Sequence, residues 1–492
     1  MTTLEQVCFA EENHNKTVIS TFDKDFKVED IHQLKQDFEK MLAGEADLTG
    51  KRVALLVPNT DAYIALVFAV NKLGGTVVPL STQLREGDLS AILDSASPHI
   101  IFAIKHHQGK DFSGMISSWT SGSNLACNIY ESNDGLEWTS WQSSGVSPAI
   151  DSFSRHFILF TSGSTGVPKG VVLSQEAIFT HIMIISRLIN GRTGDRYLHL
   201  PPQTVAFGLV GILCAIKFGY RVAIPDAFDL PKITAMMKRI TVTKMVGTPS
   251  LLRGLYNIAQ HIQPEVLTVL EECYLAGEMI KEGDIKEFDL ISRAKFIGIY
   301  GITEAGGIMT CDLRGNIEWG VDEVYQFKIV ERELLLKSPA LFTHYYQQPE
   351  ITKEVLENDG WFHTGDIAEL NEEGKVVLIG RKKDLIKKAG QQVIPGEIEK
   401  ILEQHSKVAQ AAVIGAPHAV YGEQIIAFVM AESGTEAQQL YNHCASRIAG
   451  YKVPDQVKLV NELPSISGKV DKTTLRKQFD SKEVMTSGRG SL

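Results

Sequence analysis

Residues 160–170 read FTSGSTGVPKG, and this loop carries the most information about the chain. A strand-like stretch at 157–160 leads into it, a second short strand, VVL, leads out, and a helix is expected from Ser174. Three glycines, four hydroxyl residues and Lys169 supply N–H groups, O–H groups and one positive charge, which together can wrap a polyphosphate. The alternative is a polar surface turn. The GxxxxGK spacing before Ser or Thr that marks P-loop kinases and GTPases is absent.

The segments around this loop alternate between strand-like and helix-like patterns. Apolar runs at 52–58 and 76–80 flank a helical stretch at 61–74, an order that predicts a parallel α/β layer. Further predicted strands and helices lie at 99–103, 175–189, 221–225, 231–239, 244–247 and 295–299. Residues 108–150 are rich in Ser, Gly and Asn, and we expect an irregular surface segment or a small β excursion there.

The pattern changes after residue 325. Three short strands, QFKIV, RELLLK and KVVLIG, come first, and a basic segment at 381–384 follows. The helices and strands expected after this segment lie at 395–404, 408–414, 424–431, 435–449 and 456–460. We therefore predict an α/β protein with a large multi-layer N-terminal domain of parallel sheets over residues 1–380. A hinge at 381–384 would join it to a small α+β C-terminal domain over residues 384–492.

Length and composition exclude several classes of protein. The 492 residues are enough for at least two domains, and 44% apolar with 22% charged residues is ordinary for a globular protein. The net charge, 49 − 59 = −10, gives no support for broad nucleic-acid binding. Six scattered cysteines without CxxC spacing, and an N-terminus without a signal-peptide pattern, suit a reducing, cytoplasmic setting. The longest apolar run, 205–216, is too short to span a bilayer.

Five further motifs follow the loop in order along the chain. They are YGITE at 300–304, WFHTGD at 361–366, GRKKD at 380–384, KAGQQVIPGEIE at 388–399 and PSISGKVDK at 464–472. Taken singly, each is also typical of a glycine turn, a basic linker, a helix N-terminus or a surface lysine. Together with the 160–170 loop they resemble the adenylate-forming superfamily, which holds acyl-CoA synthetases, aryl-CoA ligases, adenylation domains and luciferases. The resemblance extends from about residue 52 to residue 476.

The resemblance implies how these motifs bind Mg·ATP. Tyr300 is expected beside adenine, Thr303 near the α-phosphate, and Glu304 near Mg²⁺, a hard cation that prefers oxygen ligands. Asp366 is expected to accept hydrogen bonds from both ribose hydroxyls, because a carboxylate has acceptors only. The set implied for ATP and AMP is Thr161, Ser162, Gly163, Ser164, Thr165, Gly166, Lys169, Tyr300, Gly301, Asp366 and Arg381, with Glu304 as metal ligand.

The resemblance also implies a reaction in two halves. A carboxylate first attacks the α-phosphate of ATP, which releases pyrophosphate and forms an acyl-adenylate, and Lys469 is expected to stabilise that transition state. The catalytic set implied is Lys469, Thr303 and Glu304. In the second half a thiol attacks the adenylate and AMP leaves. The small domain is expected to rotate about Lys383 between the halves, which would bring Lys388 and Gly390 to the thiol.

The segment after 198–202 bears on the identity of the acid. Amino-acid-activating relatives carry an Asp just after a Phe to bind the α-ammonium, whereas Gly208 follows Phe207 here. We therefore expect a fatty or aromatic acid without an α-amino group. The pocket implied for it includes Val205, Phe207, Gly208 and Gly277, although apolar residues of this kind are also ordinary core residues.

Two positions and one segment depart from the family's pattern. Val205 stands where many acyl- and aryl-CoA ligases have a histidine, and Asp471 stands where the family often has an arginine. Residues 306–333 are short and lack the usual Gly-Pro stretch. These departures concern the wall of the acid pocket and the surroundings of the catalytic lysine.

Three functions remain open from the sequence. The first is an acid–CoA ligase that uses ATP, Mg²⁺ and CoA. The second is an acyl-AMP ligase that loads the phosphopantetheine of an acyl carrier protein, and the lack of the extra segment typical of fatty acyl-AMP ligases favours CoA. The third is a catalytically silent nucleotide-binding protein, which the presence of Lys169, Glu304, Asp366 and Lys469 disfavours. We expect no nucleic-acid partner and no membrane span.

Overall fold

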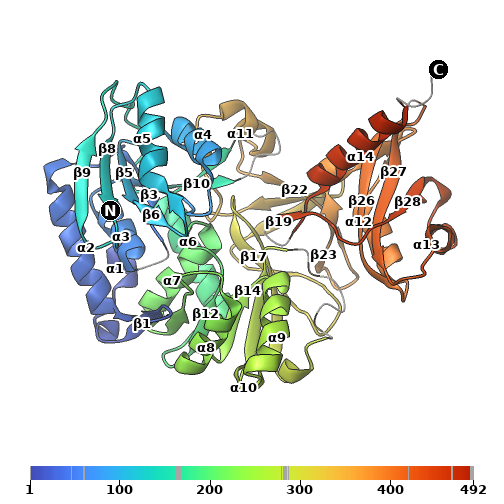
Figure 1. The fold of residues 1–492 in the computed structure, drawn as a ribbon, viewed down its shortest axis with the longest axis horizontal. Helices are drawn as coiled ribbons and strands as arrows, with labels where there is room; N and C mark the ends of the chain where they lie inside the picture. The colour runs from blue at the N-terminus through green and yellow to red at the C-terminus, as the bar shows by residue number, and fades with distance from the viewer. Residues whose placement is uncertain are drawn as a thin grey trace. The chain divides into compact units, whose positions relative to one another are not determined.

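The chain forms two compact units, coloured by residue number in Figure 1. The computed structural model describes residues 2–45, 47–58, 61–161, 168–278, 280, 285, 287–418, 420–466 and 469–487. The N-terminal unit consists of Met1–Gln326 and Lys337–Gly360, and the C-terminal unit of Phe327–Leu336 and Trp361–Leu492. Rotation at the expected hinge stays a prediction.

A nine-stranded sheet forms one half of the N-terminal unit. In spatial order its strands are β18 (Gly320–Val321), β17 (Gly306–Asp312), β16 (Lys295–Ile302), β15 (Glu272–Ala276), β14 (Lys244–Gly247), β12 (Arg196–His199), β13 (Arg221–Ala223), β1 (Thr17–Ser20) and β2 (Asp25–Lys27). The pairings from β16 across to β1 are all parallel. Parallel neighbours place their carboxyl ends at one edge of the sheet, where α/β proteins bind their ligands.

An eight-stranded sheet forms the other half of this unit. Its spatial order is β21 (His344–Tyr345), β11 (Lys169–Leu173), β10 (Phe157–Thr161), β4 (Thr76–Pro79), β3 (Arg52–Leu56), β5 (Ile100–Ile104), β8 (Asn128–Ser132) and β9 (Trp138–Gln142). The five central strands pair in parallel, and the outer pairs are antiparallel. The predicted parallel α/β architecture is therefore confirmed.

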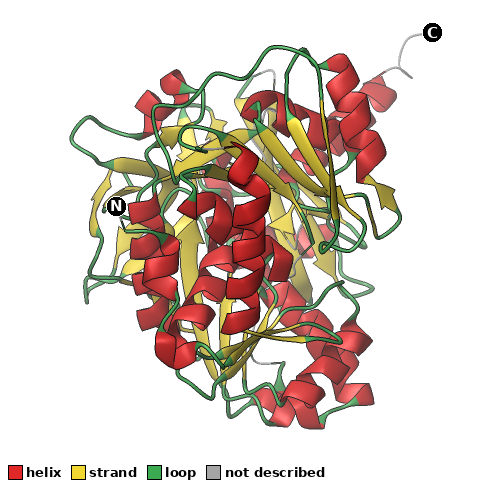
Figure 2. Ribbon diagram, turned by 90° about the vertical axis from the view of Figure 1, so that its left-hand side faces the viewer, coloured by secondary structure: helices red, strands yellow, loops and turns green. Residues whose placement is uncertain are grey.

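Helices of this unit, which are red in Figure 2, pack against strands of both sheets. Helix α3 (Asp61–Lys72) contacts β3 and β4, while α7 (Ala206–Phe218) contacts β1, β13 and β17. The short α1 (Leu4–Cys8) contacts α3, α7 and α6 (Gln175–Ile189). Every residue of α3 from Ala62 to Asn71 is buried, which explains why that helix is apolar all round. The other helices of the unit are α2 (Val28–Leu42), α4 (Glu86–Ala96), α5 (Phe112–Gly122), α8 (Leu230–Ile240), α9 (Pro249–Ile262), α10 (Glu265–Thr268) and α11 (Pro349–Val355).

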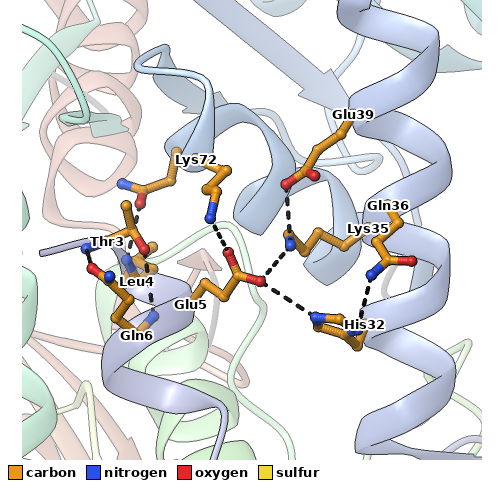
Figure 3. Close-up of polar contacts among 10 residues, drawn as sticks. Thr3, Leu4, Glu5, Gln6, His32, Lys35, Gln36, Glu39 and Lys72 are labelled. Atoms are coloured by element: carbon orange, nitrogen blue, oxygen red, sulfur yellow. Dashed lines mark hydrogen bonds and ion pairs between the residues drawn. The ribbon is translucent and has the colours of Figure 1, made fainter.

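A cluster of charges around Glu5 fastens α1 to its neighbours (Figure 3). The Glu5 carboxylate accepts hydrogen bonds from the ammonium groups of Lys35 on α2, at 2.5 Å, and Lys72 on α3, at 2.8 Å. The His32 ring lies 3.3 Å from the same carboxylate. Although burial alone would raise it, the two lysines hold the pKa of Glu5 at about 2.

Residues 108–150 contain more regular structure than the sequence predicted. The strands β8 and β9 confirm the β excursion, but α5 was not expected, because Ser and Gly disfavour helices. Asp111 caps its first turn, and Phe112, Ile116 and Trp119 bury one face at helical spacing. Packing of that face therefore outweighs the weak local propensity.

The C-terminal unit contains two larger sheets. One has the order β19 (Gln326–Val330), β20 (Glu333–Lys337), β22 (Phe362–Leu370) and β23 (Val376–Arg381). The other has the order β25 (Gln391–Val393), β24 (Ile386–Lys388), β27 (Gly422–Ala431) and β26 (Val408–His418), with β28 (Gln456–Leu459) on β27. The helices are α12 (Pro395–Glu403), α13 (Ala437–Ala445) and α14 (Lys472–Ser487). The two sheets and three helices of this unit agree with the predicted α+β character.

Two observations bear on the setting of the protein. All six cysteines are free and buried, and burial raises the pKa of Cys8 to about 12, so its thiol stays protonated. Among the described residues, no helix combines the length and apolar character needed to cross a membrane.

Candidate active site

The FTSGSTGVPKG loop joins two antiparallel strands. Thr161 ends β10 and Lys169 begins β11, and these two residues pair directly across the strands. The predicted strand, loop and strand are therefore present. The phosphate contacts predicted for Ser162, Gly163, Ser164, Thr165 and Gly166 lie outside the described residues.

The YGITE motif forms the turn between β16 and β17. A bulge falls between Tyr300 and Gly301, and Ile302 pairs with Gly306 on the returning strand. A Cβ atom at Gly301 would lie 2.4 Å from the Gly306 carbonyl oxygen, so the close approach of the two strands requires glycine. Thr303 and Glu304 therefore lie at the tip of this turn, and both are half-buried.

Glu304 and Lys169 meet at a residue that the sequence did not single out. The Tyr345 hydroxyl donates a 2.7 Å hydrogen bond to Oε1 of Glu304. The Lys169 ammonium lies 5.2 Å from the centroid of the Tyr345 ring, within range of a cation–π contact. The fold therefore brings together one anionic and one cationic residue of two separate predicted motifs.

Tyr300 packs against another residue that the motifs did not reveal. The rings of Tyr300 and Trp319 meet edge to face with centroids 6.1 Å apart. A Cβ atom at Gly298 would lie within 3.1 Å of the Trp319 ring, so Trp319 covers this face of β16. Trp319 comes from segment 306–333, which the sequence predicted to be short, and it is buried.

Residues predicted for the acid pocket follow strands whose carboxyl ends share one edge of the nine-stranded sheet. Gly277 follows β15, and Val205 caps α7 after β12. A Cβ atom at Gly208 would lie 1.9 Å from the Pro202 carbonyl oxygen. Glycine at 208 therefore has a steric reason of its own, which weakens the argument that its lack of a carboxylate reports on the acid. Phe207 is half-buried and Val205 is exposed.

Two buried histidines lie close to these elements and serve as neutral packing groups. Nε2 of His181 lies 2.8 Å from the Ala340 carbonyl, and Nε2 of His199 lies 3.0 Å from the Gly208 carbonyl. Burial lowers the pKa of each to about 4. Neither is therefore charged at neutral pH.

In the C-terminal unit, the structure pairs Asp366 with Arg381. These residues face each other across β22 and β23, with Nε of Arg381 2.7 Å from Oδ1 of Asp366. Asp366 is only 5% exposed, and its backbone N–H donates to Oγ1 of Thr364. The two residues, both implied for nucleotide binding, are thus neighbours, and the guanidinium orients the carboxylate.

A second ion pair lies in the same sheet. Glu333 accepts a hydrogen bond from the Lys382 ammonium at 2.6 Å and lies 3.1 Å from Nδ1 of His363. Although burial alone would raise it, these two groups hold the pKa of Glu333 below its ordinary range. Lys382 lies in the turn after β23 and is thus paired with Glu333 of β20, and Lys383, the predicted pivot, follows it in the same turn and is exposed.

The residues predicted for the thiol half and for catalysis lie further along this unit. Gly390 adopts φ +80°, and a Cβ atom there would meet nothing within 4 Å, so this turn between β24 and β25 has open space beside it. The Lys388 ammonium lies 2.7 Å from Oδ1 of Asp455. Lys469 begins the two-residue strand β30 (Lys469–Val470), and its side chain lies outside the described part of the chain.

The fit of Mg²⁺ can be judged at Glu304. Within the described residues, no three His, Cys, Asp or Glu side chains gather as a metal-ion site. Oε1 of Glu304 is occupied by Tyr345, and no described residue donates to Oε2. One carboxylate oxygen is thus available, which suits an ion that proteins hold by one or two carboxylates together with substrate phosphates.

Comparison with known proteins identifies the family. The family described as AMP-binding enzyme matches residues 10–329, and its C-terminal domain family matches residues 397–469. The first match covers more than half of the chain, which therefore belongs to the AMP-binding enzyme family. The predicted adenylate-forming membership is confirmed.

Two ligases and one solved structure are similar to this chain over most of its length. The long-chain-fatty-acid–CoA ligase FadD13 of Mycobacterium tuberculosis is 29% identical over 461 residues, which cover 87% of this chain and 88% of the relative. The fatty acid–[acyl-carrier-protein] ligase ScoC of Streptomyces coeruleorubidus is 26% identical, covering 92% and 91%. The ATP-bound crystal structure of MatB from Rhodopseudomonas palustris superposes with a TM-score of 0.83 at 23% identity, covering 97% and 98%, which confirms the fold.

Proposed function

We propose that this chain activates a carboxylic acid without an α-amino group, fatty or aromatic, and transfers the acyl group to the thiol of CoA. The observation that carries the proposal is the meeting of Lys169 and Glu304 at Tyr345, in a member of the AMP-binding enzyme family. The relative FadD13, named as a ligase of long-chain fatty acids and CoA, supports both the acid and the acceptor.

The first half-reaction joins two anions and therefore depends on positive charge. A carboxylate oxygen attacks the α-phosphorus, and the bond to pyrophosphate breaks. We assign phosphate binding to the 161–169 loop with Lys169, and transition-state stabilisation to Lys469. Glu304 would hold Mg²⁺, which supplies neutralisation of the phosphate charge when bound. Thr303 contributes a hydroxyl beside the α-phosphate.

The second half-reaction needs the nucleotide held while its acyl group leaves. Asp366 accepts hydrogen bonds from the ribose hydroxyls, with Arg381 beside it, and Tyr300 stacks beside adenine. The sulfur of CoA attacks the acyl carbon, the bond to the phosphate oxygen breaks, and AMP departs. The turn at Lys388–Gly390 is assigned to the thiol, because a glycine without neighbours allows close approach of a pantetheine arm.

A carrier-bound phosphopantetheine is the second candidate acceptor. The relative ScoC, named as a ligase of fatty acids and an acyl carrier protein, favours it. Both acceptors present the same thiol, so the first half-reaction is common to the two candidates. We place the reaction in the cytoplasm, since six free thiols suit a reducing compartment.

The test is acid-dependent ATP–pyrophosphate exchange over fatty acids of several lengths, benzoates, cinnamates and amino acids. Exchange with a non-amino acid, followed by acyl-CoA and AMP on adding CoA, would support the proposal. Exchange without acyl-CoA would favour the carrier protein. Lys469→Ala should abolish exchange while ATP still binds. No exchange with any acid, in a preparation that binds ATP, would contradict the proposed activity.

A further inference from the structure

Tyr345 touches two residues of the proposed site at once. Its hydroxyl bonds to Glu304 at 2.7 Å, and its ring lies under the Lys169 ammonium at 5.2 Å. The side chain is buried, and the residue is 5% exposed.

The segment that carries Tyr345 also holds the backbone of Glu304. The Phe342 N–H donates to the Glu304 carbonyl at 2.7 Å, and the Phe342 and Tyr345 rings pack with centroids 4.8 Å apart. Tyr345 itself pairs with Val171 on β11, and its N–H donates to Oγ1 of Thr352. Both the main chain and the carboxylate of Glu304 are thus fixed by residues 342–345.

The next residue, Tyr346, makes a similar bond in a different place. Its hydroxyl donates to Oδ1 of Asp151 at 3.2 Å, and the Arg52 guanidinium lies 5.5 Å from its ring. Arg52 and Asp151 form a buried ion pair at 2.7 Å. Tyr345 ends β21 and Tyr346 begins the turn that follows, and the two hydroxyls reach different carboxylates. Tyr346 therefore offers a matched control.

We propose that Tyr345 is a positioning residue that orients the Glu304 carboxylate for Mg²⁺ and holds Lys169 beside it; this inference rests on the proposed function. One carboxylate oxygen is bonded to the phenol, so the other is directed to the metal and its phosphates. Partners behind a metal ligand fix its orientation, and their loss typically weakens metal binding. Tyr345 also couples the metal ligand to the phosphate-binding lysine through one rigid side chain.

The test measures ATP binding by calorimetry, with saturating Mg²⁺ and with EDTA, in the wild type and two matched variants. Tyr345→Phe keeps the ring beneath Lys169 and removes only the hydroxyl. It should reduce the Mg²⁺-dependent gain in ATP affinity by roughly 10- to 100-fold and leave metal-free binding unchanged. Tyr346→Phe removes the equivalent hydroxyl from Asp151 and should retain the full gain. Tyr345→Leu should also weaken metal-free binding, because Lys169 loses its ring.

The outcomes separate this inference from the proposed function. A full Mg²⁺-dependent gain in Tyr345→Phe would overturn the inference, and so would an equal loss in Tyr346→Phe, which would mean general loosening. Thermal unfolding of each variant checks that the unit remains folded. If the wild type bound Mg·ATP and Tyr345→Phe lost the gain, but no acid supported exchange, the role of Tyr345 would stand and the proposed function would fail.

Discussion

Removing the carboxylate of Asp366 should abolish the recognition of the ribose hydroxyls. Asp366 is 5% exposed, and Arg381 holds one of its oxygens at 2.7 Å, so the carboxylate is paired, oriented and shielded from water. A hydrogen bond to a charged group contributes about 1.5–3 kcal/mol, which corresponds to about 10- to 150-fold in affinity. We therefore expect Asp366→Asn to raise the dissociation constant for ATP by about this factor for each hydroxyl bond lost.

Deoxynucleotides turn this expectation into a thermodynamic cycle. Wild-type protein should lose affinity for 2′-deoxy-ATP and 3′-deoxy-ATP relative to ATP, measured by calorimetry, whereas Asp366→Asn should distinguish the three much less. The matched control is Glu333→Gln, which changes a carboxylate in the same sheet that pairs with Lys382 instead. Glu333→Gln should distinguish ATP from the two deoxynucleotides as the wild type does. If Asp366→Asn kept the full penalty for the deoxynucleotides, Asp366 would not bind the ribose.

Two further predictions concern stability. Above its ordinary pKa of about 4.5, Glu5 stabilises the fold in full, and this contribution falls as the pH drops toward its native pKa of about 2. Glu5→Gln should thus lower the free energy of unfolding by about 1–2 kcal/mol at pH 6, after allowing for the partial exposure of Lys72 (Figure 3). At pH 3 the loss should be roughly half as large. Urea unfolding at the two pH values measures this loss, and a loss independent of pH would refute the prediction. Arg52→Met should lower the free energy of unfolding by about 3–5 kcal/mol, because Asp151 keeps the Tyr346 hydroxyl but is left largely buried without a positive charge. A loss below about 1 kcal/mol in urea unfolding would contradict that burial penalty.

Much of the fold could be predicted from local pattern. Helix α3 is apolar from Ala62 to Val70 and lies between two strand-like runs, so its burial beside β3 and β4 could be predicted from the sequence. Helix α5 could not be predicted in the same way. Its Ser and Gly residues give no helical signal, and the face formed by Phe112, Ile116 and Trp119 is stabilised only by packing in the folded unit.

Some residues of the candidate site could likewise be predicted from the sequence, and others could not. Glu304, Asp366 and Arg381 each lie in a motif, so the sequence predicted them as residues of the site. Tyr345 carries no motif of its own, because its role arises from the pairing of β21 with β11, which joins distant segments of the chain. The steric reason for Gly208 was also hidden, since it depends on the path of the Pro202 carbonyl.

The most direct test of the proposed reaction follows an oxygen atom. The acid selected by the exchange assay is labelled with ¹⁸O in its carboxylate and incubated with ATP, Mg²⁺ and CoA, and the AMP is analysed by mass spectrometry. If the carboxylate attacks the α-phosphorus and the thiol then displaces AMP, one labelled oxygen must remain in AMP while acyl-CoA accumulates. Unlabelled AMP, or ADP in place of AMP, would contradict an acyl-adenylate and with it the function proposed for this chain.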